Sequence, residues 1–349
     1  MNRSFVLVLL IIAACSPDEP GHDLPAYDGI ASFNTNLSAN EPFSNYAAEF
    51  KAAYDAGARG AQLAAPWKNL NPSGTTYDLT PINNQYFGFN VLKDMGFEQI
   101  FVNLGIITIG SRSMPADLAG LSFDDPVVKS RLRSLIDAVM PHFNDKVVYV
   151  SLGNEVDTYF ASHAGEWLAF IRLVEDARTY IKTKNPSVIV GVTTTFHGAT
   201  VGAASEISML NSKLDAIMLT YYPINSDFTV RDPSAVEADV HKMLVLAGNK
   251  PIVAQEWGYP SSSILGSSEE KQAEFFAASM TALKEHGAGH FPFVSFFKYR
   301  DWNAAHCQAV TGQSAGQTFF EFMASLGLKT NEGAPKKAYA IVTSALTPR

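Results

Sequence analysis

Positive charge is scarce in this sequence of 349 residues. Lysine and arginine together number 26 against 34 aspartates and glutamates, which gives a formal net charge of −8 at pH 7. A protein that binds nucleic acid needs a basic face to neutralise phosphates, so this balance disfavours a nucleic-acid partner. It also favours an uncharged ligand over a polyanion.

Cysteine is scarcer still, since only Cys15 and Cys307 occur. A small secreted fold that depends on several disulfides is therefore excluded. We expect Cys307 to be a buried small hydrophobic residue rather than a reactive thiol.

Several signatures of hydrolases and cofactor-dependent enzymes are also missing. No Gly-x-Ser-x-Gly elbow occurs, and no His, Asp and Glu side chains have the spacing of metal ligands. We therefore expect neither a metal ion nor a cofactor. Lys298 lies on a predicted strand, where a lysine can form a Schiff base with a carbonyl substrate, but we interpret it as a surface or ion-paired lysine.

The N-terminus has its own pattern. Arg3 precedes an apolar run over residues 5–12, and Ala13-Ala14-Cys15 follows. The run is too short to span a bilayer and has the layout of a secretory signal peptide, which we assign to residues 1–14. Residues 15–25 show no apolar periodicity and are predicted to form a tether.

The segment Ile12-Ala13-Ala14-Cys15 resembles the lipobox of bacterial lipoproteins. The resemblance implies that Cys15 is acylated and becomes the first mature residue, so that the protein is secreted and anchored to a membrane by lipid. Ser16 in place of Asp implies the bacterial outer membrane by the same resemblance. The alternative is an ordinary cleaved signal peptide with an incidental cysteine.

Residues 26–349 alternate short β-like runs with longer helical ones and show no shift in composition. Helical spacing of apolar residues with capping signals occurs, for example, over 43–56 and 125–143. The strands are predicted at 29–34, 60–67, 99–109, 146–153, 188–195, 214–222, 252–256 and 293–299. Strands that alternate with helices in this number predict a single (β/α)8 TIM barrel.

A doubly wound open sheet is the alternative fold. That fold places a glycine-rich phosphate loop after its first strand, where this chain has Asn34-Thr35-Asn36. The barrel is therefore favoured.

Two of the predicted strands end in a glutamate. The apolar run Val147–Val150 continues to Gly153 and is followed by Asn154 and Glu155, while Ile252-Val253-Ala254-Gln255 leads to Glu256. An acid at the exit of a buried parallel strand does not serve packing. Because barrel active sites gather at the carboxyl ends of the strands, the two glutamates indicate a catalyst with two carboxylates.

Other polar and aromatic side chains are predicted at the same ends. They are Asn34, Trp67, Asn154, His197, Tyr222, Trp257 and Trp302. Flat aromatic faces beside amides and carboxylates suit sugar rings. The alternatives are that the tryptophans fill the top layer of the barrel and that His197 is structural.

The Asn-Glu pair that closes the fourth strand and the Glu that closes the seventh resemble the signature of the clan A retaining glycoside hydrolases, the 4/7 superfamily. The segment 67–78 resembles the tryptophan-to-aspartate stretch that follows the second strand in many members. Thr220-Tyr221-Tyr222 resembles the sixth-strand segment whose last tyrosine contacts the nucleophile, and Asp301-Trp302 resembles the eighth-strand segment whose tryptophan lies under the sugar. Glu256-Trp257-Gly258-Tyr259-Pro260 is similar to the nucleophile segments of bacterial endo-glycanases.

The resemblance implies a role for each matching residue. Glu256 is expected to be the nucleophile, and Glu155 the acid that becomes a base in the second step. Asn154 is expected to donate to the sugar 2-hydroxyl, Tyr222 to position Glu256, and Trp302 to lie under the sugar. The chain departs from the pattern at two places: Gln62 stands where many members have arginine, and Thr220 where some have histidine or asparagine.

The sequence thus predicts a retaining β-glycosidase with a polysaccharide or oligosaccharide substrate. The resemblance favours endo-acting cleavage of a β-glucan, a β-galactan or a β-mannan. A non-catalytic glycan-binding surface lipoprotein and a transglycosylase remain as alternatives, because a fold alone does not establish an activity.

Overall fold

Parallel strands close into a barrel in the computed structural model, which describes residues 27–38 and 40–346. The sheet runs in the order β7-β6-β3-β2-β1-β11-β10-β9-β8. Its strands are β1 (Ile30–Phe33), β2 (Gly60–Ala64), β3 (Gln99–Asn103), β6 (Val147–Ser151), β7 (Ile189–Gly191), β8 (Thr193–Thr195), β9 (Ile217–Tyr221), β10 (Ile252–Trp257) and β11 (Phe293–Phe296). Since β7 and β8 are two parts of one strand, pairing with β6 and β9 closes the ring. The predicted TIM barrel is confirmed.

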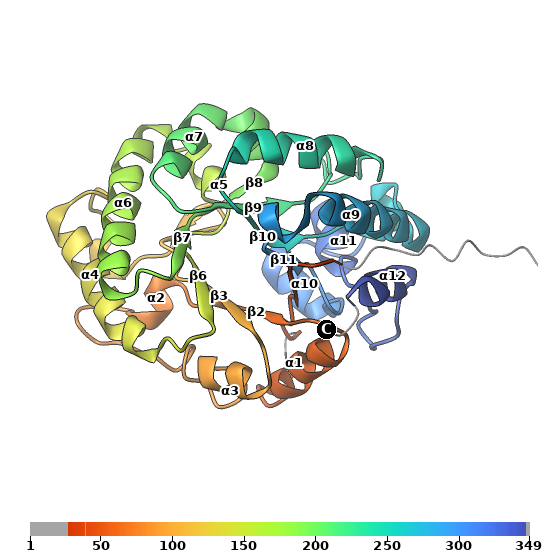
Figure 1. The fold of residues 1–349 in the computed structure, drawn as a ribbon, viewed down its shortest axis with the longest axis horizontal. Helices are drawn as coiled ribbons and strands as arrows, with labels where there is room; N and C mark the ends of the chain where they lie inside the picture. The colour runs from red at the N-terminus through yellow and green to blue at the C-terminus, as the bar shows by residue number, and fades with distance from the viewer. Residues whose placement is uncertain (1–26, 39, 347–349) are drawn as a thin grey trace, which may run out of the picture.

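Helices surround this barrel on the outside (Figure 1). The longer ones are α1 (Asn45–Asp55), α4 (Pro126–Val139), α6 (Trp167–Lys184), α7 (Ala204–Ser212), α8 (Ala235–Ala247), α9 (Glu269–His290) and α12 (Lys337–Ala345). The shorter ones are α2 (Trp67–Leu70), α3 (Phe89–Asp94), α5 (Val156–Phe160), α10 (Ala304–Thr311) and α11 (Thr318–Ala324). None of the helices within the described residues is both long and apolar enough to cross a membrane.

Local sequence signals account for two of the helix starts. Asp125 caps α4 by accepting a hydrogen bond from the backbone N–H of Val127, and Pro126 occupies the first helical position. Ser268 caps α9 by accepting from the N–H of Lys271. Because these side chains satisfy amides that the helix leaves free, both starts agree with the prediction from sequence.

Several predicted strands end earlier in the structure than the sequence indicates. The second strand ends at Ala64, so that Trp67 begins α2. The third strand ends at Asn103 and is followed by a hairpin of β4 (Ile107–Thr108) and β5 (Ser111–Arg112).

An apolar plug fills one end of the barrel interior. It consists of Phe101, Tyr149, Ala216, Met218, Val253 and Phe293. The ring of Phe293 lies 5.9 Å from that of Phe101 and 5.3 Å from that of Tyr149, measured between centroids. A Cβ atom at Gly60 would lie 2.5 Å from the Phe293 ring, so glycine is required there. The plug lies at the start of the strands and leaves the carboxyl ends for polar side chains.

Phe293→Ala tests how much this plug stabilises the barrel. Removing the ring leaves a cavity, and we expect the free energy of unfolding to fall by about 3–5 kcal/mol. Urea denaturation followed by circular dichroism measures it. Phe43→Ala is the matched control, because Phe43 is 63% exposed. A loss for Phe293→Ala no larger than that of the control would contradict the packing account.

Candidate active site

The two glutamates lie at the carboxyl ends of β6 and β10, and both are half-buried. Glu155 follows β6 and stands immediately before α5, with φ 48° and ψ 47° in the left-handed region. Glu256 is the fifth residue of β10. The structure therefore brings both predicted carboxylates to the carboxyl end of the barrel.

Thr220 on β9 links the two acids. Its hydroxyl donates a 2.7 Å hydrogen bond to Oε1 of Glu155. Its Cα is also in register with that of Glu256 on the adjacent strand. Adjacent strands lie about 4.8 Å apart, so the two carboxylates converge on one space above Thr220.

An irregularity in β10 turns Glu256 toward this space. The register with β9 shifts between Ala254 and Glu256. In a regular strand consecutive side chains point to opposite faces, so only one of Gln255 and Glu256 would face inward. Because the shift inserts one extra residue into β10, it interrupts the alternation of faces, and both Gln255 and Glu256 point inward.

Burial and mutual repulsion make the two carboxyl groups unequal. Burial, reinforced by the charge of Glu256, raises the pKa of Glu155 to about 8, although the Thr220 hydroxyl opposes this. Burial also raises the pKa of Glu256, but hydrogen bonds from Tyr222 and Gln255 oppose the rise. Glu256 therefore ionises first, and Glu155 retains its proton near neutral pH.

Tyr222 holds the carboxylate of Glu256. Its hydroxyl donates a 2.5 Å hydrogen bond to Oε2 of Glu256. The ring packs edge-on against Phe297 and Phe322. A Cβ at Gly258 would lie 2.8 Å from the Tyr222 ring and 2.3 Å from the carbonyl oxygen of Phe297, so glycine permits this packing. The placement agrees with the expected positioning role.

A chain of amides fixes Asn154. Gln255 donates from Nε2 to Oδ1 of Asn154 at 2.6 Å. The Oε1 atom of Gln255 accepts from the Asn103 amide at 3.2 Å and from the Thr193 hydroxyl at 2.6 Å. These bonds determine which way both amide groups point. Nδ2 of Asn154 has no hydrogen-bond partner within the described residues, which leaves it available to a ligand.

Two of the predicted sugar-binding tryptophans are buried instead. Trp67 and Trp257 are both 0% exposed and belong to the hydrophobic core. Trp67 begins α2 and does not end a strand, while Trp257 points outward and donates from its indole to the hydroxyl of Ser279. Since a substrate cannot reach either ring in this structure, the prediction for Trp67 and Trp257 is corrected.

Trp302 and Asn34 lie in the segments that follow β11 and β1, but both are largely covered. Trp302 is 8% exposed, and its indole donates to the carbonyl of Asn36 at 3.1 Å. Nζ of Lys298 lies 3.2 Å from the centroid of the Trp302 ring. Asn34 is 7% exposed. Each of them exposes only a small part of its surface, as Asn154 does at 7%.

Lys298 differs from the expectation of a surface or ion-paired lysine. It is 0% exposed, and its amine makes no hydrogen bond within the described residues. Burial lowers its pKa well below the usual range, because an apolar surrounding disfavours the charged form. Cys307, by contrast, is free and buried as predicted.

His197 lies at the rim of the site, just after β8, and is exposed. Burial raises the pKa of the nearby Asp157, and hydrogen bonds from Thr195 and the charge of His197 oppose this rise. Asp157 accepts hydrogen bonds from the backbone and hydroxyl of Thr195. No group of three His, Cys, Asp or Glu side chains in the described part of the chain is arranged to hold a metal ion.

Two residues of the site, Asn103 and Gln255, escaped the sequence prediction. Gln255 donates to Asn154 and accepts from Asn103. Thr220, which donates to Glu155, faces the site as the two-residue period from Tyr222 predicts. Gln255 had no such signal, since regular alternation from Glu256 turns it outward.

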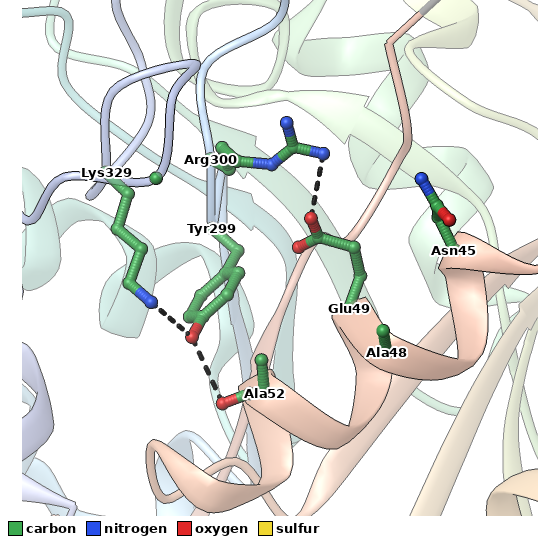
Figure 2. Close-up of a pocket in the computed structure, with 8 residues that line it drawn as sticks. Asn45, Ala48, Glu49, Ala52, Tyr299, Arg300 and Lys329 are labelled. Atoms are coloured by element: carbon green, nitrogen blue, oxygen red, sulfur yellow. Dashed lines mark hydrogen bonds and ion pairs between the residues drawn. The ribbon is translucent and has the colours of Figure 1, made fainter. Parts of the chain in front are cut away.

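A separate cavity of about 290 Å³ lies between α1 and the segment after β11 (Figure 2). Arg300 forms an ion pair with Glu49 at 2.8 Å, and Nζ of Lys329 donates a hydrogen bond of 2.9 Å to the hydroxyl of Tyr299. That hydroxyl in turn donates to the carbonyl of Ala52. These contacts anchor the segment that carries Trp302 to α1.

The raised pKa of Glu155 predicts how stability depends on pH. The pKa of Glu155 is about 8 in the folded protein and 4.5 ordinarily, so the folded state binds this proton more tightly than the unfolded state does. The stability that this proton contributes is therefore complete below pH 4.5 and is lost as the pH rises through about 8. Glu155→Gln does not titrate, and we expect it to gain stability relative to the parent between about pH 5 and about pH 9. Urea midpoints at several pH values measure this, and a constant difference would contradict it.

Comparison with known proteins shows the fold. No protein-family model and no curated protein matches the sequence. An exo-β-1,4-mannosidase from an Opitutaceae bacterium is 16% identical with a TM-score of 0.69, over 92% of this chain but 61% of the mannosidase. A GH5_18 protein from Bifidobacterium longum, in complex with Manβ1-4GlcNAc, is 13% identical with a TM-score of 0.71, over 91% of this chain and 78% of that protein.

A β-glucosidase is 14% identical with a TM-score of 0.63, over 86% of this chain and 87% of the glucosidase. The chain thus spans less than two thirds of the mannosidase and most of the other two. At these identities the likeness shows a TIM barrel that this chain shares with known glycoside hydrolases.

Proposed function

We propose that this protein is a retaining β-glycoside hydrolase. The observation that carries the proposal is the pair Glu155 and Glu256, which share one half-buried space with unequal affinities for a proton. Glycoside hydrolysis by two carboxylates needs one protonated acid and one ionised carboxylate at the same pH. The barrel fold shared with the mannosidase, the GH5_18 protein and the glucosidase supports the same proposal.

The first step forms a covalent intermediate. An oxygen of ionised Glu256 attacks the anomeric carbon of the sugar. The bond from that carbon to the glycosidic oxygen breaks, its electron pair stays on the oxygen, and Glu155 supplies the proton. The raised pKa of Glu155 keeps this proton available at neutral pH.

The second step uses the same groups in reverse. Glu155, now a carboxylate, removes a proton from water while the water oxygen attacks the anomeric carbon. The bond to Glu256 breaks and returns an ionised carboxylate. Two inversions at one carbon leave the configuration unchanged.

Two side chains position the reacting groups. Tyr222 donates to Oε2 of Glu256 and so leaves the other oxygen for attack. Asn154 presents Nδ2, which suits donation to the sugar 2-hydroxyl, a bond that strengthens as charge develops on the ring.

For the substrate we propose a neutral β-linked oligosaccharide or polysaccharide, such as a β-glucan, a β-galactan or a β-mannan. The net charge of −8 disfavours an acidic glycan. Similar structures named as a mannosidase and a glucosidase support the mannan and glucan members of this class. Product lengths from laminarin, galactan and mannan distinguish endo from exo action and hydrolysis from transglycosylation. Binding without any product would contradict the enzyme and indicate a glycan-binding protein.

Azide rescue tests the two roles separately. We expect Glu256→Ala to lose turnover and to regain it with azide, giving a glycosyl azide of inverted configuration, because azide replaces the nucleophile. Glu155→Ala with azide should give the retained configuration on an activated glycoside. Glu237→Ala, at an exposed position of α8, is the control. The opposite configurations would reverse the assignment, and full activity in Glu256→Ala would refute it.

We also propose that the protein is secreted and anchored by lipid on Cys15, at the bacterial outer membrane. Cys15 lies outside the described residues, and the proposal rests on the lipobox-like segment that ends there. Cys15→Ala should move the protein from the membrane fraction to the soluble fraction, because acyl chains supply about 0.8 kcal/mol per buried methylene. Incorporation of labelled palmitate measures acylation directly, and its absence in the parent would refute the anchor.

A further inference from the structure

The hairpin between β4 and β5 has an unusual turn. Thr108 pairs with Ser111, so Ile109 and Gly110 are its two loop residues. Both have positive φ, 37° and 70°. Two-residue hairpin loops with positive φ at both positions favour Asn-Gly, because asparagine and glycine tolerate the left-handed region.

Isoleucine is a poor choice for this position. A β-branched residue at positive φ is a true outlier, with a strain of about 1–3 kcal/mol. Packing does not compensate for the strain, since Ile109 is 60% exposed. The chain therefore retains a strained, exposed apolar side chain that contributes little to the fold.

The turn lies directly beside the proposed active site. The N–H of Ile109 donates to the carbonyl of Asn154 at 3.1 Å, and the N–H of Asn154 donates to the carbonyl of Ile107 at 2.9 Å. Thr108 and Asn154 form an isolated parallel bridge. Glu155 is the next residue, so the hairpin is fixed to the backbone that carries the proposed proton donor.

Glu155 determines where the leaving group lies. An acid that protonates the glycosidic oxygen must stand within hydrogen-bond reach of it, so the departing part of the substrate passes on the side of Glu155. An exposed aliphatic side chain at that place suits the C–H face of a sugar ring or an aryl group. It would bury apolar surface only when such a group is bound.

We propose that Ile109 contacts the leaving-group portion of the substrate and determines specificity for it. The proposal rests on the function proposed above and goes beyond it by naming a residue outside the catalytic pair. On this proposal, the chain keeps a strained isoleucine at position 109 because its exposed side chain binds the departing group.

Ile109→Asn separates strain from binding. Asparagine fits the turn, so we expect the melting temperature to rise by about 2 °C. For one glycone that the parent hydrolyses, kcat/KM should fall about tenfold for a disaccharide and for an aryl glycoside. It should remain unchanged for the glycosyl fluoride, which has no group to contact Ile109.

The aryl glycoside and the fluoride distinguish contact from an indirect effect. Both have good leaving groups and need little protonation, but only the aryl glycoside reaches Ile109. A loss confined to the disaccharide would show that Ile109 acts through Glu155 and would overturn the proposal. Equal losses on all three substrates, or no loss on any, would overturn it as well.

Two further variants complete the test. Ile109→Gly removes the side chain and the strain together, and it should repeat the kinetics of Ile109→Asn. Val245→Asn is the matched control, because Val245 is 72% exposed on α8 and should leave kcat/KM unchanged. A parent protein that hydrolyses none of the three substrates would refute the proposed function itself, and a lower melting temperature in both Ile109 variants would refute the strain.

Discussion

Repulsion between the carboxylates of Glu155 and Glu256 is the constraint on which the rest of the site depends. Ionising both would place two negative charges in a half-buried space that screens them poorly. The neighbouring side chains decide which carboxyl group ionises. Tyr222 and Gln255 both stabilise the negative charge of Glu256, whereas the carboxyl group of Glu155 accepts a hydrogen bond from Thr220 alone among the described residues. A proton donor and a nucleophile thus arise from two identical side chains.

The barrel interior supports this inequality through two layers of different character. The apolar plug around Phe293 excludes water from the starting ends of the strands. Above it lies a polar layer in which Asn103 and Thr193 donate to Gln255, and Gln255 in turn donates to Asn154. A hydrogen-bonded network of this kind is stiff. It therefore holds Asn154 in one orientation before any ligand binds.

Sequence periodicity predicted the barrel and its two acids because buried parallel strands are short apolar runs that stop at polar residues. It failed where the backbone is irregular or ends early. Trp67 was misplaced because β2 ends at Ala64. Gln255 was missed because a register shift breaks the alternation in β10. The Ile109-Gly110 turn lacks the Asn-Gly signal, so the hairpin that adjoins Asn154 was read as a continuation of its strand.

Two backbone irregularities solve one geometric problem at the site. A regular strand turns only every second side chain inward, yet each strand end here contributes two neighbouring side chains. After β6, the left-handed conformation of Glu155 lets the side chains of both Asn154 and Glu155 point into the site. In β10, the shifted register has the same effect on Gln255 and Glu256. Because left-handed backbone is unfavourable for glutamate, it persists only where neighbours hold it, and the bonds from the hairpin to Asn154 and from Thr220 to Glu155 do so. The strained turn at Ile109 belongs to the same arrangement, since it sits on the backbone that presents the proton donor.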